Sequence, residues 1–498
     1  MGIFRDFCAF FFYLSIAAVL IGFFTESESV MAAATFAAGL TYAARDYFDT
    51  KPGRINVMTF YAAFGALWFG MSNFLGYWAE GRVYEEMFFD FEIREFFFQG
   101  QIIATLAVII PLLSYDVIER NFGTKMRLTV PKIGFDMPDW LLLRCGFIFF
   151  AASWIPYGLD MNLAFLGILA SLLSLGTYIA IFSLNSRWLV DPRPQWPAWM
   201  RWLPLLMALS ESAYFAVFGG ERGRVAWPLV AFSLPFVLHK KINWKTAFVG
   251  VLFFASFAFV FKQLAETRRS LWGADRIQYV LQKLSPDEAQ PVLASDVSDA
   301  DREDTTGVMR LMARLSTFNQ LSQVYRLSVE DGYYNGETMA YMVYVFIPRV
   351  LWADKPLVAP GQWFASKLGR GQRLEGGGFS NAINMTIPGE LYLNFGWLGV
   401  VFGLIGLTAM YFMFWEAACQ GGEVGNILGH AFAFALLYQA IFNGSHFGGV
   451  VNLTMWYLLF LALTYIVVTI VQQGRWGMFQ RDKTAPSLSI LPPSSAKI

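Results

Sequence analysis

Long uncharged runs of apolar residues recur along this chain, and they constrain its fold more than any other feature. A run of about 20 apolar residues is long enough for a helix to cross the hydrocarbon core of a bilayer. Hydrophobic residues make up 56% of the sequence and charged residues 15%, whereas soluble domains carry about 25% charged residues. The composition excludes an ordinary soluble enzyme and predicts an all-α polytopic membrane protein.

The apolar runs predict about twelve transmembrane helices. They lie at residues 8–24, 30–44, 56–78, 97–115, 140–156, 161–184, 202–219, 225–238, 244–264, 390–415, 427–442 and 452–472. The second run follows the first so closely that we expect the first to be kept as a membrane anchor rather than cleaved as a signal.

Basic residues gather in alternate connections between these runs. They concentrate at 45–54, 120–132, 187–201 and 240–245 and again in the C-terminal tail. Because positively charged loops stay in the cytoplasm, we expect both termini on the cytoplasmic side. The connection at 416–426, with two glutamates and no basic residue, is the exception.

One connection, residues 265–389, is far longer than the others and falls on the outer face by this alternation. Loops of such length are often functional. The chain is therefore predicted to have a bundle of about nine helices at 1–264. The large loop, with amphipathic and re-entrant helical segments, follows at 265–389, then about three helices at 390–480 and a cytoplasmic tail at 481–498.

Side chains that bind metals are scarce. The three cysteines and three histidines are scattered, as Cys8, Cys145, Cys419, His239, His430 and His446. Asp299 and Asp301 form a DxD pair, a pattern that some sugar-nucleotide enzymes use for a divalent metal, but a solvated acidic connector often contains one by chance. Because of this poor set of ligands we expect no metal, and we expect no cofactor. Basic and acidic residues balance at 37 each, so we expect no nucleic-acid partner.

Cationic residues of the large loop lie beside apolar segments. Residues 306–330 are expected to form a helix with Arg310 and Arg314 on one face. Either these arginines snorkel to the headgroups from an amphipathic helix, or they face an anionic ligand. The apolar run within 339–356 is too short for a span and favours a re-entrant or interfacial segment, which Pro348 breaks.

Arg349 and Lys355 follow that break and either anchor the segment to headgroups or bind an anion. The next segment, 361–400, is rich in glycine. Its basic residues before the tenth span are Lys367, Arg370 and Arg373. Glycine backbone N–H groups and guanidinium groups both bind phosphate. On the outer face the natural anion is a lipid-linked phosphate or diphosphate.

Two strings in this region, IPRVLWADKP at 347–356 and SNAINMTIPGELYLNFGWLGV at 380–400, resemble the polymerases of O-antigen and exopolysaccharide repeat units. The positions that match the family pattern are Pro348, Arg349, Trp352, Lys355, Pro356, Thr386, Gly389, Glu390, Tyr392, Asn394, Phe395, Gly396 and Gly399. Arg314 also lies where such proteins often carry an arginine. The specific resemblance covers 310–400.

The resemblance implies a GT-C type membrane glycosyltransferase in the bacterial inner membrane. Such an enzyme transfers a growing glycan from its polyprenyl-diphosphate carrier to a new lipid-linked repeat unit in the periplasm. It needs no nucleotide sugar and no metal. Its expected partners are lipid-linked oligosaccharide and membrane lipid, with a flippase and a chain-length regulator as possible protein partners.

The reaction requires cations that stabilise the departing diphosphate. Arg314 and Arg349 are the first candidates for this catalytic role. The candidate substrate-binding residues are Arg310, Lys355, Arg370, Arg373, Trp352, Tyr392 and Asn394. Any of the cations could instead bind the diphosphate of the acceptor, because two lipid carriers must dock.

A general base must take the proton of the acceptor hydroxyl. Glu390, at the outer end of the tenth span, is a candidate, and the alternative is a carboxylate placed at a helix start by the macrodipole. His446, in a short outer loop, is a second candidate or an ordinary turn residue. Glu211 lies within a span, where a carboxylate indicates function, unless it is protonated or paired in the bundle.

Two other functions stay open on the sequence. An O-antigen-type ligase, which transfers the whole glycan to lipid A or a protein, shares this architecture. A flippase or transporter of lipid-linked sugar belongs to a different class, but transporters have internal repeats, and we find no such self-similarity here. A structural component of an assembly complex is a further alternative.

Overall fold

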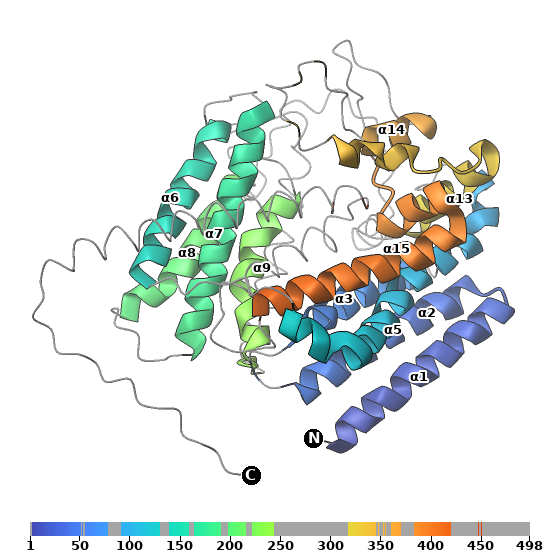
Figure 1. Cartoon of the computed structure of the whole chain (residues 1–498), viewed down its shortest axis with the longest axis horizontal. Helices are drawn as coiled ribbons and strands as arrows, with labels where there is room; N and C mark the ends of the chain where they lie inside the picture. Colours follow the sequence, from blue (N-terminus) through green and yellow to red (C-terminus); the bar gives the residue numbers. More distant parts are fainter. Residues whose placement is uncertain are drawn as a thin grey trace, which may run out of the picture. The chain divides into compact units, whose positions relative to one another are not determined.

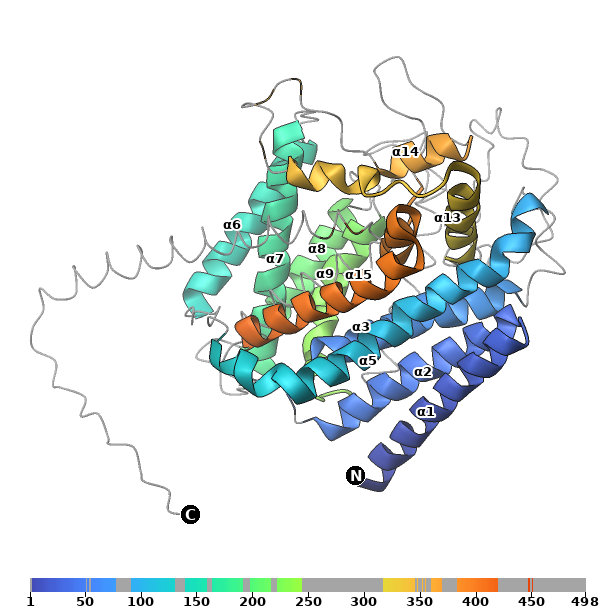
Figure 2. The ribbon, with the colours of Figure 1, turned by 45° about the vertical axis from the view of Figure 1, so that its right-hand side comes forward.

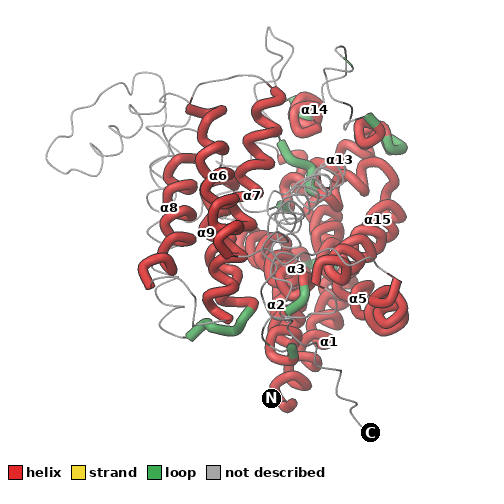
Figure 3. Tube along the Cα trace, turned by 60° about the vertical axis from the view of Figure 1, so that its left-hand side comes forward, coloured by secondary structure: helices red, strands yellow, loops and turns green. Residues whose placement is uncertain are grey.

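The computed structural model describes residues 2–50, 52, 55–77, 91–129, 139–158, 164–190, 198–215, 222–243, 317–344, 347, 352, 354, 360–369, 383–419, 447 and 450. The chain divides into two units, and all of these residues belong to the first, Met1–Thr454. Across these described residues the regular elements are all helices (Figure 1, Figure 3). The all-α prediction is therefore confirmed for this part of the chain.

The first two helices, α1 (Gly2–Phe24) and α2 (Glu28–Asp49), form an antiparallel hairpin (Figure 2). The turn between them uses a left-handed residue, Glu26, with φ 51°. Ser27 caps α2, because its side chain accepts a hydrogen bond from the backbone N–H of Val30.

Helix α2 packs closely on the segment that follows it, α3 (Val57–Gly65) and the π-helical η1 (Ala66–Met71). A Cβ on Gly39 would lie 2.6 Å from the carbonyl oxygen of Ala62, and one on Gly70 would lie 2.5 Å from the nitrogen of Phe36. Small residues of this kind let helix backbones approach each other within membranes. The short 3₁₀ helix η2 (Phe91–Phe96) then leads into α5 (Phe97–Thr129), which packs against α2.

The next described helices are α6 (Asp139–Gly158), α7 (Ala164–Val190), η3 (Ala198–Trp202), α8 (Leu203–Tyr214) and α9 (Arg222–Leu238). Helices α7, α8 and α9 contact one another. Their shared core contains Tyr178, Ile181, Met207, Ala208 and Trp227. Apolar side chains from three helices thus form one packed core.

The last described elements are α13 (Phe318–Asp331), η5 (Glu337–Val343), α14 (Pro360–Lys367) and α15 (Ile387–Cys419). Helix α13 contacts both α5 and α15. Phe318 lies close to two glycines of the bundle. A Cβ on Gly76 would lie 2.5 Å from the Phe318 ring, and a Cβ on Gly100 would lie 3.2 Å from the Phe318 carbonyl oxygen.

Among the residues that the structure describes, three helices are long and apolar enough to cross a membrane: Phe4–Phe24, Ile93–Thr124 and Ile387–Glu416. They coincide with the runs predicted at 8–24, 97–115 and 390–415. The chain is therefore a helical membrane protein. Large apolar side chains on α1 point outward, such as Phe10 and Phe24, which are 62% and 80% exposed, as expected for a surface that faces lipid.

The structure refines several expectations. The runs predicted at 244–264, 427–442 and 452–472 lie outside the described residues. The helix expected over 306–330 is described only from Phe318 onward. Of the segment expected within 339–356, the structure describes the 3₁₀ helix η5, which ends at Val343, and the single residues Tyr344, Ile347, Trp352 and Asp354. The tenth span was expected to be continuous from 390, but it is interrupted at Gly396.

Candidate functional site

Helix α15 breaks at Gly396, where φ is 62° and ψ is −151°. This region of backbone conformation is essentially restricted to glycine. A Cβ on Gly403 would lie 2.4 Å from the side chain of Leu391, and one on Gly399 would lie 2.5 Å from the Leu391 carbonyl oxygen. The short helix at 387–395 therefore folds back against the long helix at 397–419 (Figure 2).

The break frees two backbone carbonyl groups, which an unbroken helix would bond to residues four positions later. The loop after α13 satisfies both. The N–H of Tyr334 donates to the carbonyl of Leu393 at 3.1 Å, and the N–H of Asn335 donates to the carbonyl of Asn394 at 3.1 Å. Irregular backbone at membrane depth needs such partners, so α13, its loop and α15 form one connected structure.

Glu390 lies on the short helix before the break, and its side chain is fully buried. The hydroxyl of Thr338, from η5, donates to the Glu390 carboxylate at 3.5 Å. Tyr341, also from η5, interacts with Glu390 electrostatically. A buried carboxylate among hydroxyl groups is an arrangement that can accept a proton from a substrate.

Asn394, one helical turn after Glu390, is also fully buried. Its carbonyl oxygen accepts a hydrogen bond from the N–H of Gly336 at 2.9 Å. Its amide nitrogen donates to Thr338 Oγ1 at 2.6 Å and to the carbonyl of Glu390 at 2.8 Å. These bonds favour a positioning role for Asn394 over the direct substrate contact expected from the sequence.

Residues with positive φ cluster around this carboxylate. Thr386 has φ 65°, Asn335 has φ 47° and Gly336 has φ 91°. A positive φ is a genuine outlier for a β-branched residue such as Thr386. Its hydroxyl nevertheless caps the short helix, because it accepts a hydrogen bond from the N–H of Gly389 at 3.3 Å. Strained backbone of this kind concentrates at functional sites.

Tyr392, a sequence candidate for substrate binding, lies in a group of aromatic rings beside the break. Its ring stacks on Tyr325 at 5.5 Å and meets Trp397 edge-on at 4.7 Å. Tyr333 meets it edge-on at 6.1 Å and is 48% exposed. The group joins α13 to both parts of α15, and its most exposed ring is that of Tyr333.

A charged contact joins the end of α13 to the end of α14. Lys367 Nζ lies 2.9 Å from Asp331 Oδ2, and the hydroxyl of Tyr334 donates to the same oxygen at 2.6 Å. The Tyr334 hydroxyl and the Lys367 ammonium together hold the pKa of Asp331 below its ordinary value. Lys367, one of the expected phosphate ligands, also lies 6.0 Å from the centre of the Trp363 ring.

A buried chain of polar side chains connects α13 to the bundle. The N–H of Thr317 donates to Asn73 at 3.0 Å, and the Asn73 amide donates to Gln101 at 3.0 Å. Gln101 then donates to Thr105 at 3.2 Å, and Thr105 shares a 2.9 Å hydrogen bond with Thr35. This series of hydrogen bonds fixes the start of α13. The side chains of Leu321 and Val324, on the same helix, lie beside Gly389 of α15, the neighbour of Glu390.

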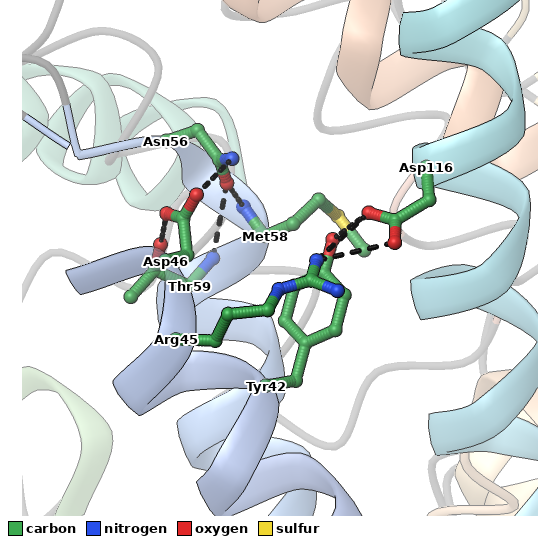
Figure 4. Close-up of polar contacts among 7 residues, drawn as sticks. All are labelled: Tyr42, Arg45, Asp46, Asn56, Met58, Thr59 and Asp116. Atoms are coloured by element: carbon green, nitrogen blue, oxygen red, sulfur yellow. Dashed lines mark hydrogen bonds and ion pairs between the residues drawn. The ribbon is translucent and has the colours of Figure 1, made fainter. Parts of the chain in front are cut away.

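A second polar group lies where α2, α3 and α5 meet (Figure 4). Arg45 binds both carboxylate oxygens of Asp116 at 3.1 Å, and the hydroxyl of Tyr42 donates to Asp116 at 2.7 Å. Asp46 accepts hydrogen bonds from Asn56 and from the hydroxyl of Thr59. From the sequence, Arg45 was expected only as a charge in a connection between spans. The one available signal was that Arg45 and Asp116 each stand immediately after an apolar run.

Glu211 is buried, and its environment supports the alternative that it is paired within the bundle. It accepts hydrogen bonds from Ser153 at 3.2 Å and from the indole nitrogen of Trp154 at 2.9 Å. Trp154 in turn stacks on Tyr214 at 4.6 Å. These contacts join α6 to α8.

The remaining sequence candidates are only partly described. Trp352 is 38% exposed, and its ring meets Tyr344 edge-on at 5.8 Å. The candidates outside the described residues are Arg310, Arg314, Arg349, Lys355, Arg370, Arg373 and His446. The structure thus joins Glu390 and Asn394 through hydrogen bonds that include Thr338, a residue not predicted from the sequence. Tyr392, on the same short helix, lies instead in the aromatic group.

Among the residues that the structure describes, none form a group of three or more His, Cys, Asp or Glu side chains able to hold a metal. The chain matches no protein-family model. Comparisons with curated proteins and with solved structures also find no match.

Proposed function

We propose that this chain is a polymerase of lipid-linked oligosaccharide repeat units in the synthesis of a surface polysaccharide. One observation carries the proposal. The segment 386–399, which bears the family resemblance, is also the segment that builds the helix break and holds the buried Glu390 carboxylate. The family-like residues therefore have geometric roles in one candidate site.

In this proposal a sugar hydroxyl of the acceptor attacks the anomeric carbon of the growing glycan. A bond forms between that oxygen and the carbon, and the bond from the carbon to the lipid diphosphate breaks. Glu390 takes the proton of the attacking hydroxyl, a step worth about 10²–10⁴-fold in rate. The diphosphate leaves with the electron pair, and the proton is later released to water.

The leaving diphosphate needs fixed cations. Arg314 and Arg349 are the proposed residues, because guanidinium groups bind phosphate oxygens in pairs. One well-placed donor of this kind contributes about 3–4 kcal/mol to the stabilisation of developing charge. Arg310, Lys355, Arg370 and Arg373 stay proposed substrate-binding residues because they are cations, and His446 stays a second proposed residue for proton transfer.

The proposal includes a location and an architecture. The protein would lie in a bacterial inner membrane with its termini in the cytoplasm and the loop at 265–389 in the periplasm, where lipid-linked repeat units are polymerised. About twelve spans with a GT-C type arrangement follow from the apolar runs and the resemblance.

Deletion of the gene and electrophoresis of the surface polysaccharide test this function. A polymerase predicts that the deletion strain attaches only single repeat units to its surface acceptor. Long chains that stay on the lipid carrier would instead identify a ligase. Unpolymerised lipid-linked units that accumulate on the cytoplasmic side would identify a flippase, and either result would reject the polymerase.

A further inference from the structure

The hydrogen bonds around Asn394 have a defined direction. The N–H of Gly336, 2.9 Å away, can only donate, so the atom of Asn394 that faces it is the carbonyl oxygen. This contact fixes the orientation of the amide group, which is otherwise ambiguous. The amide nitrogen of Asn394 must therefore face Thr338.

The same reasoning fixes the proton of Thr338. The Asn394 amide nitrogen, 2.6 Å from Thr338 Oγ1, can only donate, so the hydroxyl oxygen accepts there. The hydroxyl proton is then directed to Glu390 Oε1, the acceptor 3.5 Å away. That distance is long, and catalytic hydrogen bonds of unliganded enzymes often tighten only when substrate binds.

We propose that Thr338 is a positioning residue that donates its hydroxyl proton to the Glu390 carboxylate and keeps it ionised and oriented. Its catalytic meaning rests on the proposed function, in which an ionised Glu390 accepts the proton of the acceptor. Asn394 acts one step further away, because it holds Thr338 in the donating orientation.

Two further contacts near Glu390 are described. Tyr341 faces it from η5 and is a neutral phenol at ordinary pH. From α13, the contacts at the neighbouring Gly389 are the apolar side chains of Leu321 and Val324. Thr338 is thus the residue of η5 whose hydroxyl makes a hydrogen bond to the carboxylate in this structure.

Infrared titration of the purified protein in lipid vesicles tests the proposal without substrate. Glu390→Gln identifies the protonated-carboxyl band of Glu390. In Thr338→Val, which loses only the hydroxyl, we expect the titration midpoint of that band to rise by about one pH unit, the size of one hydrogen bond to a carboxylate. Thr338→Ser retains the donor and should titrate close to the wild type.

Asn394→Asp provides a second variant, because its carboxylate still accepts from Gly336 but cannot donate to Thr338. The new carboxylate accepts the Thr338 proton and adds a negative charge, so the Glu390 midpoint should rise at least as far as in Thr338→Val. If the wild type shows no titration in the accessible range, the variants should bring one into it.

An unchanged midpoint in Thr338→Val, equal shifts in Thr338→Val and Thr338→Ser, or no titration in any variant would overturn the proposal. Activity is a separate readout, in which the acid limb of the pH–activity profile should move upward in Thr338→Val and return in Thr338→Ser. If the infrared midpoint shifts in Thr338→Val but the wild-type protein makes no polymer, the proposed function is rejected and the hydrogen-bond assignment stands.

Discussion

At Gly396 the backbone of α15 takes a conformation, φ 62° and ψ −151°, that other residues adopt only with strain. A Cβ at this position would also lie 2.8 Å from the Tyr333 ring. The break places Glu390 on a short helix of its own, beside η5, which bears Thr338. The geometry of the candidate site around Glu390 therefore requires a glycine at position 396.

We predict that Gly396→Ala destabilises the protein by about 1–3 kcal/mol, the cost of one residue held in such a backbone region, with a further cost from the contact with Tyr333. Thermal unfolding in detergent measures the change as a lower melting temperature. Gly406→Ala is the matched control on the same helix, because a Cβ there has open space around it. Equal melting temperatures for the two variants would contradict this account of the break.

The candidate site was partly predictable at this scale. Glu390, Tyr392 and Asn394 could be selected from the sequence because they stand in a segment with a family resemblance. Thr338 could not, because its contact with Glu390 joins residues 52 positions apart and exists only where α15 is broken. A glycine within an apolar run does not by itself distinguish a break from a straight helix.

At the scale of elements, α13 is held at both ends. At its start, Thr317 hydrogen-bonds to Asn73 of the bundle. At its end, Asp331 binds Lys367 of α14. Because α13 also contacts both α5 and α15, these two polar contacts add to the packing that holds the helix against the segment that carries Glu390.

The Asp331–Lys367 contact should depend on pH. Because the pKa of Asp331 is lowered in the fold, its contribution is present above the ordinary value of about 4 and is lost as the pH falls through the lowered value. Both side chains are partly exposed, so we expect a coupling of only about 0.2–1 kcal/mol. A double-mutant cycle of Asp331→Asn and Lys367→Gln, measured at pH 7 and at acid pH, checks this.

The coupling should disappear at acid pH and weaken in high salt, since exposed charges are screened. The pair Arg5 and Asp49, whose side chains are 49% and 58% exposed and lie 3.7 Å apart, serves as a reference for an ordinary surface contact. A coupling that does not change between pH 7 and acid pH would show that the contact is not ionic.

The whole molecule is a helical membrane protein, and apolar runs predicted much of it. Helices α1, α6 and α7 match their predicted runs because a long uncharged stretch determines a helix almost without context. The π-helical turn at Ala66–Met71 and the fold-back of α15 could not be predicted, because both depend on contacts between distant segments. The count of twelve spans stays a prediction.

Topology is the prediction that belongs to the whole molecule. Basic connections on one side predict cytoplasmic termini and an extracytoplasmic loop at 265–389. Compartment-sensitive reporters fused at residue 300 and at the C-terminus should give opposite signals. A reporter fused after residue 132, in a connection expected to be cytoplasmic, is the control. Matching signals at residue 300 and the C-terminus would place the loop in the wrong compartment for lipid-linked repeat units.

The central claim is that Glu390 acts as the base in the polymerisation of lipid-linked repeat units. The most direct test measures the turnover of a synthetic polyprenyl-diphosphate repeat unit by the purified protein in lipid vesicles. The account predicts that the wild type and Glu337→Gln, an exposed carboxylate nearby on η5, extend the glycan at similar rates. Glu390→Gln should be slower by about 10²–10⁴-fold at equal protein amount. Glycans of the same length, made at the same rate by Glu390→Gln, would contradict it.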